Sequence, residues 1–407
     1  MRHVVAGDAP AAGRGLGHLL DLVAAVLESG DVPLWPRRGG PEELARLALP
    51  PAAAELLAGA AVVLPTSGST GEPKPVVLDA AALTASATAT TDRLGGPGQW
   101  VLALPTDRVA GWQVLVRSVL AGTAPVLVPV PAPRHAAGHG FAAGPFAEAV
   151  AKLAGPRRYT SLVPTQVHRL LADAVGREAL AALDGVLVGG AALPRALAER
   201  ARAAGVRLVT TYGMTETAGG CVYDGEPLPG VAARTDESGR LWLSGPVLAR
   251  GYLDRPELTH RRFPWEAGRR WFLTDDAGTV GPEGVRVLGR VDDLVNTGGV
   301  KVAPALVEEA LRGLPGVADC AVLGLPDPEW GQRVVAVVVP EGDGVPAATP
   351  DWRARLRGRL PDEALPREVR LRPALPVLPS GKVDRLRLRQ ELAGDSGTMA
   401  LPPTESS

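Results

Sequence analysis

The sequence predicts an α/β protein with a large N-terminal domain and a small α+β C-terminal domain. Short apolar runs alternate with helix-like segments as far as Ala218, and glycine-punctuated strands follow. A second set of strands and helices begins beyond Gly289. At 407 residues the chain is too long for one small core, so two or three domains are expected.

The first elements surround a glycine-rich loop. Residues 16–28 repeat leucine and valine at helical spacing and predict an amphipathic helix, and residues 42–57 show a weaker helical pattern. The apolar run 60–64 predicts a short buried strand, and residues 80–94 a helix behind the loop. An order of strand, glycine loop and helix predicts an anion at the N-terminus of that helix.

Strands and helices then alternate along the large domain. Strands are predicted over residues 101–104, 125–130, 159–163, 185–188 and 206–210, and helices over 109–120, 166–171 and 194–204. Residues 131–144 predict a loop. Such alternation predicts parallel-rich sheets with flanking helices on both faces, and ligands at the carboxyl ends of the strands.

After Ala218 the pattern changes. Residues 240–244 alternate like a half-exposed strand, and turns expected at Gly251, Gly268 and Gly278 indicate a small antiparallel region.

Beyond Gly289 a smaller domain is expected. Helices are predicted over 303–314 and 352–360, and strands over 318–323, 334–339 and 368–371. The predicted limits are 1–290 for the N-terminal domain, 291–393 for the C-terminal domain and 394–407 for a disordered tail.

Bulk composition excludes several classes of function. The net charge of −1 gives no nucleic-acid footprint, and no run reaches the ~18 apolar residues of a membrane span. The N-terminus lacks a signal-peptide apolar region, so a cytoplasmic protein is expected. Two cysteines without a CxxC motif and six scattered histidines match no metal-ligand spacing.

The stretch from residue 66 to 74, TSGSTGEPK, is the strongest local signal. Glycines let backbone N–H groups face a ligand, while hydroxyls and a lysine suit phosphate oxygens. It is not a Walker A loop, because Pro73 precedes the lysine and Pro75 follows it. Taken alone, this stretch is also compatible with a flexible surface loop that binds no ligand. The candidate phosphate-binding residues are Thr66, Ser67, Gly68, Ser69, Thr70, Gly71 and Lys74.

Three more stretches follow in order: TYGMTET at 211–217, WFLTDD at 271–276 with GRVDDL at 289–294, and PSGKVDR at 379–385. Each alone fits an ordinary turn. Together with the loop they resemble the adenylate-forming superfamily, which contains acyl- and aryl-CoA ligases, peptide-synthetase adenylation domains and luciferases. The resemblance spans about residues 60–388.

This resemblance implies an acid–thiol ligase that uses ATP, Mg²⁺ and coenzyme A. ATP and a carboxylic acid form an acyl-adenylate and pyrophosphate, and the CoA thiol then displaces AMP. In this resemblance Ser67, Thr70 and Lys74 hold the β,γ-phosphates. Glu216 is the Mg²⁺ ligand, Thr215 bonds the α-phosphate, and Lys382 bridges the acid carboxylate and the α-phosphate. The implied catalytic residues are Lys382, Glu216 and Thr215.

Further roles follow from the same resemblance. Tyr212 stacks on adenine beside Gly190, Ala191 and Gly213. The ribose hydroxyls bind Asp276, which Arg290 assists. The resemblance also implies that the small C-terminal domain is mobile, that its hinge is Asp292, and that Gly298 and Gly299 line the pantetheine tunnel.

Within the superfamily the chain most resembles 2-succinylbenzoate–CoA ligases of menaquinone biosynthesis, through residues 104–118, 161–166 and 217–225. The acid pocket then includes Gly220, with Arg117 and Thr165 as candidates for a second substrate carboxylate. Surface or structural roles for Arg117 and Thr165 stay open.

The sequence departs from this pattern at three positions. Arg108 stands where these ligases usually carry a histidine, Asp275 replaces the glycine of Thr-Gly-Asp, and Pro75 replaces a glycine. None of these changes removes a group to which the chemistry is assigned. The change at Arg108 leaves the identity of the acid open.

Two alternatives remain: a CoA ligase for another aryl or fatty acid, and a catalytically dead homologue that only binds nucleotide. The presence of Lys74, Glu216, Asp276, Arg290 and Lys382 argues against the dead homologue. The expected partners are a small carboxylic acid, ATP and CoA, without nucleic acid or membrane span, and a homodimer is left open.

Overall fold

The computed structural model describes residues 14–29, 34, 56–66, 74–129, 141–342, 351–376 and 383–394. The described residues form two compact units. The larger unit draws on Met1–Arg234, Trp242–Thr274 and Val280–Val285, and the smaller on Thr235–Leu241, Asp275–Thr279 and Arg286–Ser407. The predicted domain limits stay a prediction. Most of the predicted helix 42–57 and loop 131–144, and the tail 395–407, lie outside the described residues.

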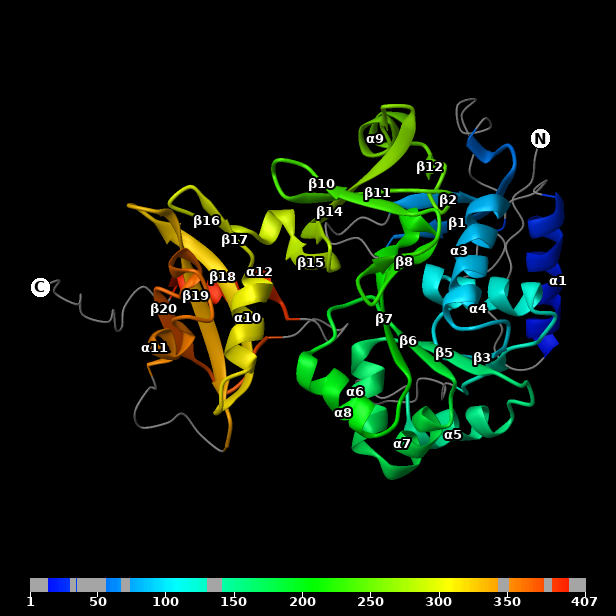
Figure 1. Ribbon diagram of the computed structural model, residues 1–407, viewed down its shortest axis with the longest axis horizontal. Helices are drawn as coiled ribbons and strands as arrows, with labels where there is room; N and C mark the ends of the chain where they lie inside the picture. Colours follow the sequence, from blue (N-terminus) through cyan, green and yellow to red (C-terminus); the bar gives the residue numbers. More distant parts are fainter. Residues whose placement is uncertain are drawn as a thin grey trace, which may run out of the picture. The chain divides into compact units, whose positions relative to one another are not determined.

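A seven-stranded sheet forms the centre of the larger unit, in the order β4-β3-β5-β6-β7-β8-β9 (Figure 1). From β4 to β7 all neighbouring strands are parallel, whereas β8 and β9 are antiparallel. This confirms the predicted parallel sheet. The strands are β3 Gln99–Leu102, β4 Val126–Leu127, β5 Arg158–Leu162, β6 Gly185–Val188, β7 Leu208–Met214, β8 Gly219–Tyr223 and β9 Glu226–Pro227.

Helices cover both faces of this sheet. Successive strand residues point to opposite faces, and both faces carry apolar side chains that must be buried. Trp100 and Leu102 belong to one hydrophobic core, whereas Val101 belongs to the other. The first core includes side chains of α1 Arg14–Ser29, α3 Ala80–Arg93 and α4 Val109–Leu120. The second includes side chains of α5 Ala143–Ala151, α6 Pro164–Ala172, α7 Ala174–Ala181 and α8 Arg195–Ala203.

The glycine-rich loop joins two antiparallel strands, β1 Ala60–Pro65 and β2 Pro75–Asp79. With β12 Gly251–Tyr252 they form a three-stranded sheet. The predicted order of strand, loop and helix is therefore wrong, because the apolar, β-branched run of β2 comes between the loop and α3. The N-terminus of α3 is capped by the Asp79 carboxylate, which accepts from the Ala82 N–H at 2.8 Å.

A further sheet has five strands. It contains β10 Ala232–Thr235, β11 Arg240–Ser244, β13 Trp265–Glu266, β14 Arg269–Gly281 and β15 Gly284–Arg290, and α9 Pro256–Arg262 precedes β13. The antiparallel turn between β13 and β14 contains Gly268, as predicted. The turns predicted at Gly251 and Gly278 are wrong, because both residues lie inside strands. A Cβ on Gly278 would lie 2.6 Å from the Arg286 carbonyl oxygen, so close backbone approach requires this glycine.

The smaller unit is an α+β structure around a sheet in the order β17-β16-β19-β18, with β20 parallel to β19. One face packs on Leu311 and Trp352, and the other on Leu388 and Leu392. The predicted helix 352–360 ends earlier, at Leu356. The elements are β16 Val295–Thr297, β17 Val300–Val302, β18 Val317–Asp327, β19 Gly331–Pro340, β20 Glu368–Leu371, α10 Pro304–Arg312, α11 Trp352–Leu356, α12 Arg385–Gly394 and the 3₁₀ turns η3 Val291–Asp293 and η4 Asp362–Ala364.

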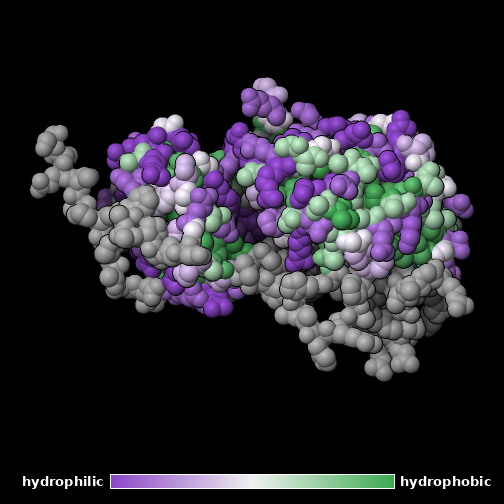
Figure 2. Space-filling view, turned by 90° about the horizontal axis from the view of Figure 1, so that it is seen from below, coloured by the Kyte–Doolittle hydropathy of each residue, from purple (hydrophilic) through white to green (hydrophobic). Residues whose placement is uncertain are grey.

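Figure 2 shows one face of the molecule, on which hydrophobic residues of the larger unit are mixed with hydrophilic ones. Within the described ranges, no helix combines the length and the apolar character that a membrane span requires.

Candidate active site

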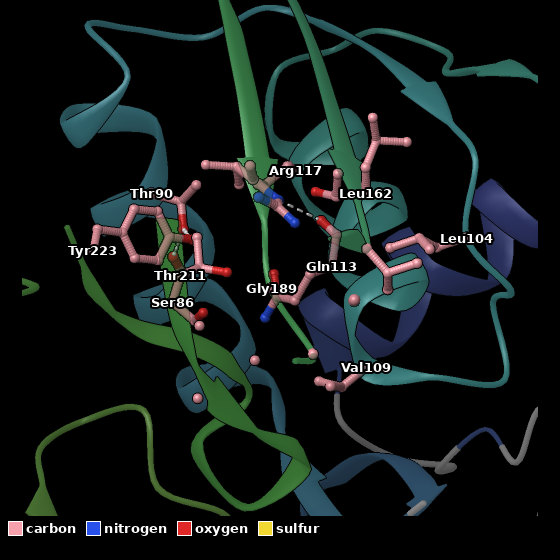
Figure 3. Close-up of a pocket in the computed structure, with 18 residues that line it drawn as sticks. Ser86, Thr90, Leu104, Val109, Gln113, Arg117, Leu162, Gly189, Thr211 and Tyr223 are labelled. Atoms are coloured by element: carbon pink, nitrogen blue, oxygen red, sulfur yellow. Dashed lines mark hydrogen bonds between the residues drawn. The ribbon is translucent and has the colours of Figure 1, made fainter. Parts of the chain in front are cut away.

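A cavity of about 120 Å³ opens in the larger unit, at the carboxyl ends of β5, β6 and β7. This is the predicted edge for ligands in a parallel sheet. Helix α3 contributes Ser86 and Thr90, and α4 contributes Gln113 and Arg117 (Figure 3). The strand ends add Leu162, Val163, Gly189, Gly190, Thr211 and Gly213, and the remaining lining is Leu104, Val109, Ala110, Ser161, Leu187, Gly219, Gly220 and Tyr223.

Arg117 is the cation of this cavity. Its side chain is buried, Nε donates to the Gln113 carbonyl oxygen at 2.8 Å, and its guanidinium carbon lies 4.2 Å from the Trp100 ring centroid. Nη1 is buried and has no hydrogen-bond partner among the described residues. Burial lowers the pKa of Arg117 to about 10, so the group is still cationic at neutral pH. A buried cation with an unused donor is suited to binding an anionic ligand.

Tyr223 and Thr90 form a neutral polar pair in the same lining. The Thr90 hydroxyl donates to the Ser86 carbonyl oxygen at 2.7 Å, and its oxygen lies 2.9 Å from the Tyr223 hydroxyl. Thr90 has one proton, so the Tyr223 hydroxyl is the donor of the second bond. Burial raises the pKa of Tyr223, although Arg117 and Thr90 act in the opposite direction. The phenol therefore adds no negative charge beside Arg117.

Glu216 lies on the 3₁₀ turn η2 Thr215–Thr217, which follows β7. The carboxylate is buried, and its Oε1 accepts from the Tyr252 hydroxyl at 2.8 Å. Within the described ranges, no group of three or more His, Cys, Asp or Glu side chains could hold a metal. Protein Mg²⁺ sites commonly use one or two carboxylates together with substrate phosphates, so one fixed carboxylate fits the predicted ligand role.

The described ends of the glycine-rich loop are bonded to each other. Thr66 N–H donates to the Lys74 carbonyl oxygen at 2.9 Å, and Lys74 N–H donates to Thr66 Oγ1 at 3.1 Å. Arg108 Nη1 donates to the Thr66 carbonyl oxygen at 3.4 Å, so the departure at this position contacts the base of the loop. Pro75 is the first residue of β2, a strand position that tolerates proline. The loop residues Ser67, Gly68, Ser69, Thr70 and Gly71 lie outside the described residues.

The predicted adenine-binding residues flank the cavity. Gly190 follows β6 with φ +77°, and Ala191 is exposed beside it. Tyr212 and Gly213 lie in β7, where a Cβ on Gly213 would approach the Gly219 carbonyl oxygen to 2.1 Å. Glycine is thus required here for strand packing, whatever it binds.

The structure separates the three candidates for the acid pocket. Arg117 and Gly220 line the cavity, whereas Thr165 is exposed in the first turn of α6 and is absent from the lining. The sequence interpretation missed Gln113, Thr90 and Tyr223. The one signal available was Gln113, a polar residue flanked by apolar ones in the helix predicted over 109–120.

The predicted ribose-binding residues belong to the smaller unit. Arg290 Nη2 lies 3.3 Å from Asp275 Oδ2, and Arg240 Nη1 lies 3.4 Å from Asp275 Oδ1. Asp275, which replaces the usual glycine, is therefore an ion-pair partner of Arg290, and the assistance of Asp276 by Arg290 stays a prediction. Asp292, the predicted hinge, is exposed in η3, and Lys382 lies outside the described residues.

Gly298 and Gly299 form the two-residue turn between β16 and β17. Both have positive φ, +60° and +82°, as hairpin turns of this length favour. A Cβ on Gly298 would lie 2.7 Å from the Trp330 ring, whereas nothing lies within 4 Å of one on Gly299. These contacts give Gly298 a structural requirement in addition to the predicted tunnel role.

We expect Gly298→Ala to lower the free energy of unfolding by about 2–3 kcal/mol, because it combines left-handed strain with a ring clash. Gly299→Ala is the matched control and should cost about 1 kcal/mol, from strain alone. Urea unfolding of both variants measures the difference. Equal losses would show that the Trp330 contact does not matter, while a loss of thioester formation in Gly299→Ala with small destabilisation would support the tunnel role.

Two family models match the chain. The model of the AMP-binding enzyme family matches residues 40–253, and that of the AMP-binding enzyme C-terminal domain matches residues 306–382. The first match alone covers more than half of the chain, which therefore belongs to the AMP-binding enzyme family. The predicted membership of the adenylate-forming superfamily is confirmed, and with it the prediction of an enzyme.

Comparison with individual proteins shows which members of the family the chain is similar to. The chain is 48% identical over 340 residues to a probable 2-succinylbenzoate–CoA ligase of Mycobacterium tuberculosis, covering 83% of this chain and 85% of the relative. It is 33% identical to a feruloyl-CoA synthase of an Amycolatopsis species, covering 80% and 68%. Among solved structures it is similar to O-succinylbenzoate coenzyme A synthetase (MenE) from Bacillus subtilis in complex with ATP and magnesium ion. That match has a TM-score of 0.64 and 25% identity, and covers 82% of this chain and 69% of the other.

Proposed function

We propose that this protein ligates 2-succinylbenzoate to coenzyme A through an acyl-adenylate, releasing AMP and pyrophosphate, as a step of menaquinone biosynthesis. The observation that carries the choice of acid is the buried Arg117, which lines the cavity and whose Nη1 has no hydrogen-bond partner among the described residues. 2-Succinylbenzoate has two carboxylates, so one can react while the other pairs with Arg117. The relatives named 2-succinylbenzoate–CoA ligase and MenE support the same choice.

In the first half-reaction a carboxylate oxygen attacks the α-phosphorus of ATP and pyrophosphate leaves. Thr215 is proposed to bond the α-phosphate, and Lys74 with the loop hydroxyls to hold the leaving phosphates. Bound Mg²⁺ would neutralise phosphate charge, with Glu216 as its protein ligand. Tyr212 and Asp276 are proposed to position adenine and ribose. In the second half-reaction the CoA thiol attacks the acyl carbon and AMP leaves.

The alternative acids differ in what they offer Arg117. A fatty acid or benzoate has a single carboxylate, which the reaction consumes, so its complex would leave the buried guanidinium without an anion. The relationship to a feruloyl-CoA synthase keeps an aryl monoacid as the second candidate. Comparing 2-succinylbenzoate with monoacids as substrates therefore tests whether Arg117 binds a second carboxylate.

We expect release of AMP and pyrophosphate with ATP, Mg²⁺ and CoA to be fastest with 2-succinylbenzoate. Benzoate, salicylate and medium-chain fatty acids complete the panel, and their kcat/KM should be at least about 100-fold lower, because a missing carboxylate leaves a buried partner unpaired. A higher kcat/KM for another acid would overturn the assignment of the substrate. Absence of turnover with every acid, despite ATP binding, would identify a homologue that only binds nucleotide.

A further inference from the structure

We propose that Gln113 is a positioning residue. Its side chain fixes the turn η2, which contains Thr215 and Glu216, beside the cavity lined by Arg117. This inference rests on the function proposed above, because it gives Thr215 and Glu216 their roles at the nucleotide. It adds a residue to which neither the motifs nor the comparisons assign a role.

The Gln113 side chain is committed to two backbone carbonyls. It is buried on α4, and its Nε2 donates to the Ala218 carbonyl oxygen at 2.8 Å and to the Leu83 carbonyl oxygen at 3.3 Å. Both acceptors require N–H donors, so the amide nitrogen must occupy this side. The other end, Oε1, is buried and has no hydrogen-bond partner among the described residues. The amide is thus held in one orientation by the turn at Ala218.

Ala218 occupies a conformation that needs such support. Its φ of +50° and ψ of +31° place it in the left-handed region, which residues with a Cβ rarely adopt. The residue is fully buried, and its carbonyl oxygen also accepts from Ser86 Oγ of α3 at 3.1 Å. Two buried side chains from two helices therefore converge on a single carbonyl in the turn.

This turn determines where the predicted catalytic residues lie. Ala218 is the C-cap of η2, and its N–H donates to the Thr215 carbonyl oxygen at 3.1 Å. Glu216 is fixed separately at its carboxylate by Tyr252. Loss of the Gln113 donors would therefore loosen the backbone of the turn and leave the Tyr252 bond in place. We expect a misplaced carboxylate and not an unfolded protein.

Gln113 also supports Arg117, although by a different group. The Gln113 backbone carbonyl accepts from Arg117 Nε at 2.8 Å, and this bond does not depend on the side chain. A Gln113 variant should therefore change the turn at Ala218 and leave the anchor for the acid largely intact. This difference separates positioning of the nucleotide site from general damage to the cavity.

The test is Gln113→Leu, which keeps most of the volume and removes both N–H donors. Amide hydrogen exchange over residues 214–219 of the ligand-free protein should become about tenfold faster, because a buried carbonyl loses one of two donors. The kcat of adenylation should fall about tenfold and half-saturation by Mg²⁺ should need more metal, while the KM for the acid changes little. Ser86→Ala should act in the same direction, and the double variant should exceed the product of the single effects, since it leaves the carbonyl with neither donor.

Ser118→Ala is the matched control. Ser118 is fully buried on the same helix, but it is not part of the cavity lining, so exchange and kcat should match the wild type. Wild-type exchange over 214–219 in Gln113→Leu would overturn the proposal, whatever Ser86→Ala shows. Should Gln113→Leu fail to fold, Gln113→Met, which is also unbranched and also lacks the two N–H donors, decides it by the same exchange measurement. Exchange in the ligand-free protein does not depend on which acid is the substrate. A wrong substrate assignment would therefore leave the exchange result unchanged, and the two proposals can fail independently.

Discussion

We expect a Lys382→Ala variant to form the acyl-adenylate about 100- to 1,000-fold more slowly than the wild type, while thioester formation from supplied acyl-adenylate is retained. Negative charge develops around the α-phosphorus as the acid carboxylate attacks. The ammonium group that the superfamily resemblance places there would stabilise this charge. In the second half-reaction the leaving AMP already carries its charge, so the same lysine contributes much less.

The two half-reactions can be measured separately. Pyrophosphate release with ATP and acid reports the first, and thioester yield from synthetic acyl-adenylate and CoA reports the second. Lys152→Ala, at an exposed lysine that follows α5 in the larger unit, is the control and should leave both rates unchanged. Equal loss of both half-reactions in Lys382→Ala would remove the assigned role of Lys382.

Elements with strong local signals were predicted well. The bounds of α4, β6, β11 and β20 agree with the predicted segments, because each is a run of suitable periodicity with a clear end. Strand β2 was missed because residues 75–79, between the loop and the helix predicted over 80–94, were assigned to no element. Its apolar, β-branched residues favour a strand, and the antiparallel pairing with β1 is the part that the local pattern does not reveal.

The motifs predicted at which strand ends the site lies, but not the hydrogen bonds between the side chains that line it. Thr90 and Tyr223 are 133 residues apart, and Gln113 and Ala218 are 105 apart, yet each pair is hydrogen-bonded. Such pairs depend on how α3 and α4 pack on the sheet. The ion pair between Arg290 and Asp275 was not predicted for a similar reason, since the sequence does not show that the carboxylate at 275 faces Arg290.

Replacing Arg117 by methionine should raise the KM for 2-succinylbenzoate about 100-fold and leave kcat nearly unchanged. A carboxylate that does not react would contact Arg117 equally in the ground state and the transition state, so its loss weakens binding and spares chemistry. Methionine keeps much of the apolar stem that packs against Trp100. Arg117→Lys should recover only part of the affinity, because lysine keeps the charge but lacks the planar fork of donors.

The decisive comparison changes enzyme and substrate together. The monoacid 4-oxo-4-phenylbutanoate lacks the ring carboxylate of 2-succinylbenzoate and is otherwise matched to it. If the ring carboxylate binds Arg117, the wild type should show a high KM for the monoacid, and Arg117→Met should raise it little further. A similar rise for both acids would mean that Arg117 maintains the shape of the cavity through Trp100 and Gln113 and does not bind the acid. Thermal unfolding of Arg117→Met provides the independent check, because a purely structural arginine would lower the melting temperature together with the affinity.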